Sequence, residues 1–349
     1  MDLTKKKVKT PTLQQYTVRV NNNAEEVVLF IHGNASSSVF WEEQLELLPS
    51  DYRGIAVDLR GYGKTEPLVM DATQGCRQWA TDILELLNEL KIARCHLVGH
   101  SMGGSAIYNL LLLEPQRFKS AVLVAPASPF GFGGTRDEIG TPCNDDFAGS
   151  GGGTVNPEFA RRMKEGDTSE DDPLSSPRVV MNNYYWKPPF RPKREEKLLR
   201  SLLSERVGED AYPGDYTESS NWPLVAPGKF GPVNASSPKY VLKTAKKLLE
   251  SGIEIPFLWV RGSHDQIVSD NSIFEMGNLG KLGAVPDYPG EEVYPPQPMI
   301  AQTRYFLEKL SESGSSYTEV VMENTGHTPF IEQPREFARL LHEHLGKHT

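Results

Sequence analysis

Three side chains that lie far apart in the sequence could together attack a carbonyl group. The first is Ser101, in the pentapeptide GHSMG, which fits the pattern G-x-S-x-G between an apolar run and a helical pattern. In that setting the serine occupies a sharp turn that lifts its hydroxyl above a sheet edge, and the flanking glycines avoid a collision across the turn. A serine hydroxyl alone is a weak nucleophile, so this chemistry also requires a general base and a group that orients the base.

The candidate base is His327, in the stretch ENTGHTPFIEQP. This histidine follows the last expected strand, and ligands of open α/β sheets bind at the carboxyl ends of the strands. His327 can therefore accept the proton of Ser101. We expect packing, loop or surface positions for the other histidines, which are His32, His96, His100, His264, His342, His344 and His348.

The candidate orienting acid is Asp265, which ends the stretch PFLWVRGSHD just past another expected strand. A carboxylate there can hold the base in the tautomer that accepts a proton from serine. Other carboxylates follow in the chain and remain candidates for this role: Asp270, Asp287, Glu291 and Glu292. We favour Asp265 because it lies nearest to the carboxyl end of the strand.

The elements that must position these residues are visible as alternating strand and helix patterns. Apolar, β-branched runs predict strands, and apolar stripes of helical period predict helices. Strands are expected at 25–33, 52–63, 94–100, 119–128, 254–265 and 317–327, and helices at 78–92, 102–116, 299–312 and 334–346. Continuous apolar strands that alternate with helices indicate an α/β fold whose sheet is mostly parallel, doubly wound and covered on both faces.

The alternation stops between residues 130 and 252, a segment rich in glycine, proline, aromatic and charged residues. Disordered chains are poor in aromatic residues, so we expect an ordered cap over the sheet. Helical patterns occur within it at 157–166 and 193–208. The predicted organisation is a first core part (1–129), an inserted cap (130–252) and a second core part (253–349).

Two features of the insertions bear on substrate binding. The aromatic stretch NNYYWKPPF lies within the cap, and from it we expect Tyr185 and Trp186 to contact the substrate. A second loop-like insertion spans residues 271–297. A cap with aromatic walls favours a bulky or aromatic substrate.

Taken together, these motifs resemble the α/β-hydrolase superfamily, whose order of nucleophile, acid and histidine matches Ser101, Asp265 and His327. The stretch FIHGNASSSVFW resembles the loop that completes the oxyanion hole in that family, and DLRGYGKTE resembles its turn after the next strand. The resemblance implies that the backbone N–H groups of Asn34 and Met102 are the oxyanion donors. It implies scaffold roles for His32 and Asp58. The 62 residues from Asp265 to His327 exceed the usual spacing in the family, and the second insertion accounts for the difference.

The resemblance implies hydrolysis of a carboxylic ester or lactone through an acyl-enzyme, without a metal or organic cofactor. Haloalkane dehalogenases and epoxide hydrolases of this fold carry aspartate where this chain has Ser101. Proline-specific peptidases of the fold carry tryptophan where this chain has Met102. The same triad would also serve carbon–carbon bond hydrolysis, thioester hydrolysis or cofactor-free perhydrolysis. A different alternative is a receptor that binds a small molecule beneath the cap without catalysis.

The bulk composition argues against several other classes of partner. The net charge of −9 and the pI near 5.5 disfavour nucleic acids and anionic membranes. Three scattered cysteines predict reduced thiols rather than a disulfide framework or a metal site. The N-terminal stretch lacks the apolar segment of a signal peptide, so a cytoplasmic location is expected. The expected partner is a small-molecule ester, and the sequence indicates no oligomeric state.

Overall fold

The computed structural model describes residues 2–349, and its centre is a sheet of eight strands in the order β1-β2-β4-β3-β5-β6-β11-β12. The strands are β1 (Thr4–Lys9), β2 (Gln14–Val20), β3 (Glu26–Ile31), β4 (Tyr52–Val57), β5 (Cys95–His100), β6 (Phe118–Val124), β11 (Pro256–Gly262) and β12 (Ser316–Met322). Strand β2 is antiparallel to both of its neighbours, and the pairs from β4 to β12 are parallel. The prediction of a mostly parallel α/β sheet is confirmed.

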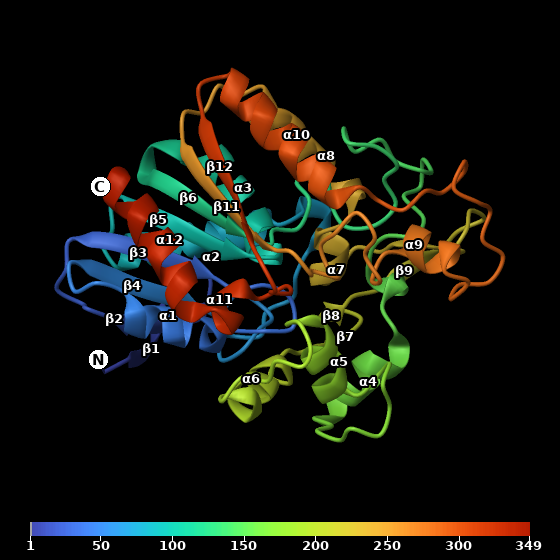
Figure 1. Ribbon diagram of the computed structural model, residues 1–349, viewed down its shortest axis with the longest axis horizontal. Helices are drawn as coiled ribbons and strands as arrows, with labels where there is room; N and C mark the ends of the chain where they lie inside the picture. The colour runs from blue at the N-terminus through green and yellow to red at the C-terminus, as the bar shows by residue number, and fades with distance from the viewer. Residues whose placement is uncertain (1) are drawn as a thin grey trace.

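Helices cover both faces of this sheet, which explains why its central strands are apolar throughout. In β3, Leu29 and Ile31 pack on one face with helices α2 (Arg77–Glu89), α3 (Met102–Leu113), α8 (Pro238–Leu249) and α10 (Met299–Glu312). The alternate residues Val28 and Phe30 pack on the other face with α1 (Glu42–Leu47) and α12 (Pro334–Lys347). Figure 1 shows α12 crossing in front of the sheet.

Strands β1 and β2 were not predicted, and for β1 the reason is physical. Strand β1 has the sequence TKKKVK and lies mostly exposed at the edge of the sheet, so it carries no apolar alternation. Charged lysines on an edge strand discourage pairing with other chains, but they remove the pattern by which a strand is recognised.

The cap region lies between β6 and β11. It contains α4 (Pro157–Glu165), α5 (Pro177–Tyr184) and α6 (Glu195–Leu202), which gather on one side of the molecule, away from α10 (Figure 1). Helices were predicted at the positions of α4 and α6, but α5 and α8 were missed. Helix α8 packs on α3 through the buried side chains Val241, Ala245 and Leu248, so this last helix before β11 covers the sheet. The domain boundaries at 129 and 252 stay a prediction.

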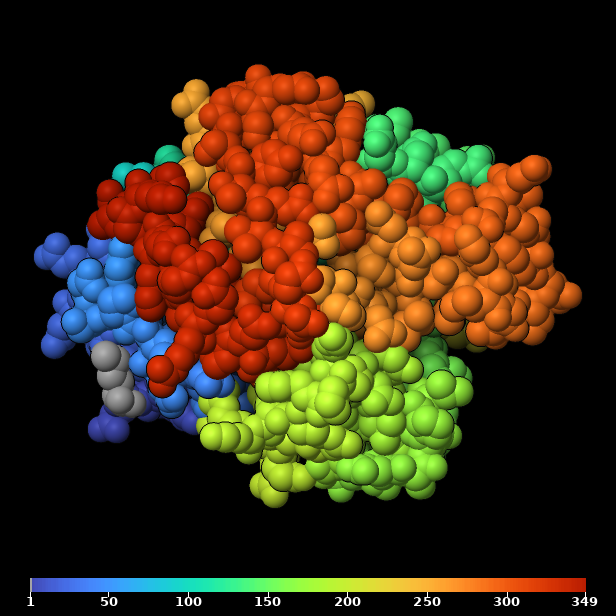
Figure 2. All heavy atoms as spheres, in the orientation of Figure 1, coloured from blue at the N-terminus to red at the C-terminus, as the bar shows by residue number. Residues whose placement is uncertain are grey.

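The second insertion contains the short helix α9 (Met276–Lys281) and packs against the beginning of the cap region. The buried Tyr294 donates its hydroxyl hydrogen to the carbonyl of Ala148 (3.0 Å). The side-chain amide of Gln297 bonds to the backbone of Gly131 (2.9 Å) and Gly133 (2.6 Å). Figure 2 shows the orange insertion lying beside the green residues that begin the cap region.

A buried polar network connects this contact between the second insertion and the cap region to the core. The side-chain oxygen of Gln302, in α10, accepts hydrogen bonds from Ser128 (2.6 Å) and Gln297 (2.7 Å). Its amide nitrogen donates to Thr135 (2.9 Å) and to the carbonyl of Asp137 (2.7 Å). One fully buried glutamine thus connects the core, the cap region and the second insertion.

Candidate active site

Ser101 lies at a strained turn between β5 and α3, with φ 53° and ψ −119°. A positive φ is uncommon for a residue other than glycine, and such strain clusters at functional sites. A Cβ on Gly99 would lie 2.8 Å from the carbonyl carbon of Gly103, and a Cβ on Gly103 would lie 2.6 Å from the carbonyl oxygen of Ile31. The turn therefore requires glycine at both positions, as the spacing predicts.

His327 and Asp265 form a buried pair after the neighbouring strands β12 and β11. His327 Nδ1 lies 2.8 Å from Asp265 Oδ2, and both side chains are 4% exposed. The other carboxylate oxygen accepts the backbone N–H groups of Ile267 (2.8 Å) and Val268 (3.0 Å). Because the carboxylate accepts a hydrogen bond from Nδ1–H, the ring keeps its Nε2 lone pair available as a base.

The rival acids lie elsewhere. Asp270 accepts hydrogen bonds from the backbone N–H groups of Ile300 (2.7 Å) and Ala301 (3.4 Å), so it caps the start of α10. Glu291 pairs with Lys281 at 3.0 Å, and Asp287 and Glu292 are exposed. Among the candidate carboxylates, Asp265 is the one bonded to His327.

His100, beside the serine, supports His327 rather than facing the cavity. Its Nε2 donates to the backbone carbonyl of His327 (2.9 Å), and the two ring centroids lie 4.6 Å apart. Burial, reinforced by the nearby His327, lowers the pKa of His100 well below its usual value. His100 is therefore a neutral hydrogen-bond donor at physiological pH.

The HGN loop (residues 32–36) follows β3 and presses against the serine. A Cβ on Gly33 would lie 2.8 Å from the Cβ of Ser101, so glycine allows this approach. Ala35 has φ 44°, a second strained position. His32 bonds to the backbone of Gly33 (2.7 Å) and Leu59 (3.0 Å), which agrees with a scaffold position.

A cavity of about 400 Å³ opens between the core and the insertions, and Ser101, His327, Asn34 and Met102 all line it. Met102 begins α3, and the first N–H groups of a helix have no partner within the helix. The cap region and second insertion supply Phe132, Thr154, Val155, Asn156, Phe159, Leu174, Val180, Tyr184, Tyr185, Tyr212, Val233, Ser236, Ile273, Phe274, Leu279 and Ala284. Over the described residues 2–349, no Asp, Glu, Lys or Arg side chain belongs to this lining.

The two aromatic residues singled out in the sequence differ in position. Tyr185 lies in the cavity wall. Trp186 is 1% exposed and outside the lining, and its indole N–H donates to the side chain of Asn182 (3.2 Å). Tyr184, Tyr212 and Phe274 line the cavity but were missed, because no periodic signal separates a cap residue that faces a cavity from one that faces the cap's own core.

Glu332, at the end of α11 (Pro329–Glu332), is a further residue that sequence analysis missed. Its carboxylate accepts the backbone N–H groups of Gly326 (2.7 Å) and Lys187 (2.8 Å). Burial raises the pKa of Glu332 to about 7, against the effect of these two hydrogen bonds, and the nearby charge of Asp265 acts in the same direction as burial.

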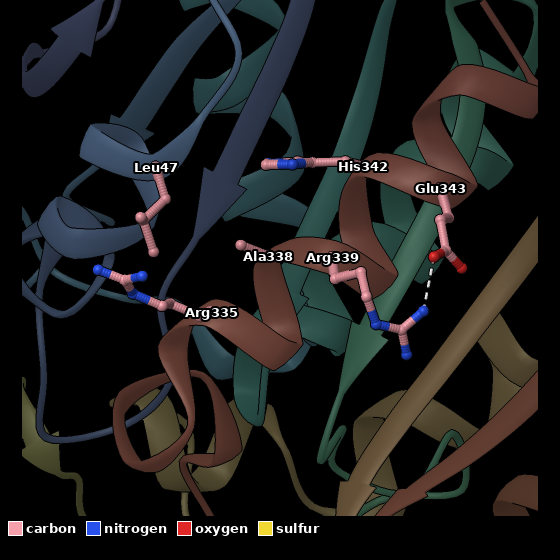
Figure 3. Close-up of a pocket in the computed structure, with 6 residues that line it drawn as sticks. All are labelled: Leu47, Arg335, Ala338, Arg339, His342 and Glu343. Atoms are coloured by element: carbon pink, nitrogen blue, oxygen red, sulfur yellow. Dashed lines mark hydrogen bonds and ion pairs between the residues drawn. The ribbon is translucent and has the colours of Figure 1, made fainter.

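Other features lie apart from this cavity. Figure 3 shows a surface groove between α1 and α12 lined by Leu47, Arg335, Ala338, Arg339, His342 and Glu343. Within residues 2–349, no group of three or more His, Cys, Asp or Glu side chains could hold a metal ion. In the same described part of the chain, no helix is long and apolar enough to cross a bilayer.

The chain belongs to the alpha/beta hydrolase family, whose sequence pattern matches residues 28–340. A provisionally named carbamate hydrolase, RutD, of Variovorax paradoxus (strain S110) is 42% identical over 100 residues, which are 28% of this chain and 37% of that protein. An epoxide hydrolase of Caballeronia sordidicola is 37% identical over 98 residues, which are 28% of this chain and 30% of that protein. These matches span about a third of the length of the curated relatives.

Solved structures agree with this family over nearly the whole chain. The esterase EaEST from Exiguobacterium antarcticum has a TM-score of 0.61 over 98% of this chain and 100% of its own, at 16% identity. A thermophilic esterase from Thermogutta terrifontis has a TM-score of 0.56 over 100% of both chains, at 19% identity. At these identities the likeness is one of fold.

The steric account of the turn predicts the effect of one methyl group. Gly103→Ala should lower the free energy of unfolding by roughly 1–3 kcal/mol, because the new Cβ meets backbone that cannot move aside. Gly346→Ala, in α12 with nothing within 4 Å of the added Cβ, is the matched control and should not destabilise the protein. Chemical denaturation of both variants checks this, and equal stabilities would contradict the steric account.

The raised pKa of Glu332 predicts a pH dependence of stability. The folded protein binds this proton more tightly than the unfolded chain does, so the contribution of Glu332 to the free energy of unfolding falls as pH rises from 4.5 to about 7. Glu332→Gln should remove that downward component from the pH profile. Glu336→Gln is the control, since its pKa is lowered by Arg339 and its titration lies below this window. Unfolding curves across the window measure the difference, and parallel profiles for Glu332→Gln and wild type would refute the assignment.

Proposed function

We propose that the protein is a serine hydrolase that cleaves carboxylic esters or lactones through an acyl-enzyme. The observation that carries the proposal is the buried pair of His327 and Asp265 (2.8 Å) in a cavity wall shared with Ser101 at its strained turn. In this proposal Ser101 is the nucleophile, His327 the general base and Asp265 the group that orients the base.

The proposed reaction has two halves. Ser101 Oγ attacks the ester carbonyl carbon while its proton passes to His327 Nε2, and the tetrahedral intermediate then expels the alcohol, which takes that proton. Water next gives a proton to His327 and attacks the acyl-serine, and the second tetrahedral intermediate releases the acid while His327 returns the proton to Ser101 Oγ. The side-chain hydrogen bond of His327 goes to Asp265, and the contact between nucleophile and base often tightens only in the complex with substrate.

Asn34 and Met102 complete the proposed machinery. Their backbone N–H groups would donate to the oxyanion of each tetrahedral intermediate, and loss of one such donor costs roughly 3–4 kcal/mol of transition-state stabilisation. Two observations support this: both residues line the cavity with the serine, and Gly33 allows the HGN loop to approach it closely.

The cavity lining supports a neutral, largely apolar substrate. Aromatic and aliphatic side chains from the cap region and second insertion form most of the wall, and the lining within residues 2–349 lacks carboxylates, ammonium groups and guanidinium groups. A charged substrate group would lose its hydration without gaining a partner. We therefore propose esters with bulky apolar or aromatic groups as the substrate class.

Ser101 also separates this proposal from epoxide hydrolysis. The family members that open epoxides carry aspartate at the turn, and the carboxylate ester formed there is hydrolysed by water. An ether formed by a serine could not be released in that way. Carbamates, thioesters and activated carbon–carbon bonds fit the same triad, and a substrate panel scored by kcat/KM would rank them against esters.

Substitution of the triad tests the mechanism. Ser101→Ala and His327→Ala should each lower kcat for a p-nitrophenyl ester by about 10⁴-fold or more, and Asp265→Asn by a similar factor. Asp270→Asn removes only a helix cap and should leave kcat close to that of wild type. Near-normal turnover by Ser101→Ala would rule out the mechanism, and reversed effects at the two aspartates would move the acid to Asp270.

A matched pair of esters tests the substrate class. p-Nitrophenyl hexanoate should exceed mono-p-nitrophenyl adipate in kcat/KM by about 100-fold or more, because the terminal carboxylate of the adipate would be desolvated without a partner. Leu279→Lys, in the wall, should narrow this preference, whereas the exposed Leu282→Lys of the same insertion should leave it unchanged. Equal rates for the two esters in wild type would contradict a neutral pocket.

A further inference from the structure

The cap segment 185–187, hereafter the bridge segment, contacts both loops that flank Ser101. One is the HGN loop (residues 32–36), and the other is the histidine loop (residues 323–328) between β12 and α11. These two loops come from opposite ends of the chain, and hydrogen bonds join the bridge segment to each of them.

On one side, the bridge segment holds the HGN loop through Tyr185. The buried Tyr185 hydroxyl donates to the carbonyl of Ala35 at 3.1 Å and lies 3.5 Å from that of Asn34. Ala35 is the strained residue of this loop, with φ 44°. A residue in a sparsely populated backbone region persists only when surrounding contacts hold it there.

On the other side, the segment holds the histidine loop by its backbone. The carbonyl of Tyr185 accepts hydrogen bonds from the backbone N–H (2.8 Å) and the hydroxyl (2.7 Å) of Thr328, the residue after His327. The N–H groups of Lys187 and Gly326 converge on the carboxylate of Glu332 at 2.8 Å and 2.7 Å. The residues on both sides of His327 are therefore tied to the cap.

The bridge segment also packs directly against the backbone of the histidine loop. A Cβ on Gly326 would lie 2.8 Å from the carbonyl carbon of Trp186, so the histidine loop lies directly on the backbone of the segment. The Trp186 indole is anchored by Asn182, whose amide nitrogen in turn donates to Glu195 in α6 (2.9 Å). The segment is fixed to the body of the cap before it reaches either loop.

We propose that the bridge segment is a positioning element that sets the HGN loop and the histidine loop relative to each other, so that the cap takes part in catalysis as well as in enclosing the substrate. The proposal rests on the proposed hydrolase function. Catalytic groups must be held within a fraction of an ångström of productive geometry by surrounding contacts. Tyr185 and Glu332 are the positioning residues, one for each loop.

Two conservative substitutions test the bridge. Tyr185→Phe keeps the ring in the cavity wall and removes the hydroxyl, and Glu332→Gln keeps the shape but turns one acceptor into a donor that faces a backbone N–H. Each should lower kcat by about tenfold while KM for p-nitrophenyl hexanoate changes less than about twofold, the size expected for one hydrogen bond that acts in the transition state. The controls are Tyr216→Phe, exposed in the cap, and Glu336→Gln, exposed in α12, both of which should match wild type.

A second measurement separates positioning from a loss of folding. The rate at which a fluorophosphonate labels Ser101 should fall in both variants in parallel with kcat, at temperatures where circular dichroism shows both to be folded. Amide exchange at Lys187 and Gly326 should rise in Glu332→Gln and stay unchanged in Glu336→Gln, which tests the contact without reference to activity.

The outcomes distinguish the two proposals. If Ser101→Ala is inactive but Tyr185→Phe and Glu332→Gln both keep wild-type kcat and labelling rates, the hydrolase stands and the bridge is overturned. Changes in KM alone would assign Tyr185 to substrate contact and also overturn the bridge. If Ser101→Ala retains activity, the proposed function fails, and unchanged exchange at Lys187 and Gly326 in Glu332→Gln would separately refute the contact.

Discussion

The sharp turn at Ser101 is the constraint around which the site is built. The turn exists only because no side chain occupies Gly33, Gly99 or Gly103, where backbone or Cβ atoms approach within 2.6–2.8 Å of the missing position. Ser101 emerges after β5, whereas His327 follows β12 at the edge of the sheet, so the histidine loop must reach back across the end of β11. His264, after β11, donates its backbone N–H to Thr325 (2.9 Å) beneath that crossing. The position of Ser101 after β5 therefore sets how far the histidine loop must reach.

The insertions do more than cover the strand ends. They form most of the neutral cavity wall, and the cap also bonds to the backbone on both sides of His327 and to the loop that carries Asn34. The HGN loop and the histidine loop of the core are thus held in place by a segment that lies between β6 and β11. The second insertion makes the separation between Asp265 and His327 long. This insertion packs directly on the beginning of the cap region, so it adds to the same support.

The elements that the sequence predicts best are those in which local pattern and tertiary role agree. Strands β3 and β5 are buried on both faces and read as continuous apolar runs, and the G-x-S-x-G turn has a steric signature in its glycines. Strand β1 carries lysines for an exposed edge and therefore lacks the alternation of a strand, whereas α8 was missed although Val241, Ala245 and Leu248 recur at helical spacing. Trp186 and Glu332 show a different limit. Whether an aromatic residue faces a cavity or a core depends on distant parts of the chain, and one of the two N–H groups that Glu332 accepts comes from Lys187, 145 residues away.

The buried network around Gln302 has a consequence for how such a protein can change. Because the Gln302 side chain bonds to Ser128, Thr135 and Gln297, it links the two insertions to each other and to the core, although about 140 residues lie between their starting points. A chimera that exchanged the cap region alone would leave buried amide and hydroxyl groups without partners, each at a cost of about 1–3 kcal/mol. We therefore expect relatives with different caps to differ in both insertions together. Recombination that exchanges both insertions at once would give a new pocket while the core stays folded.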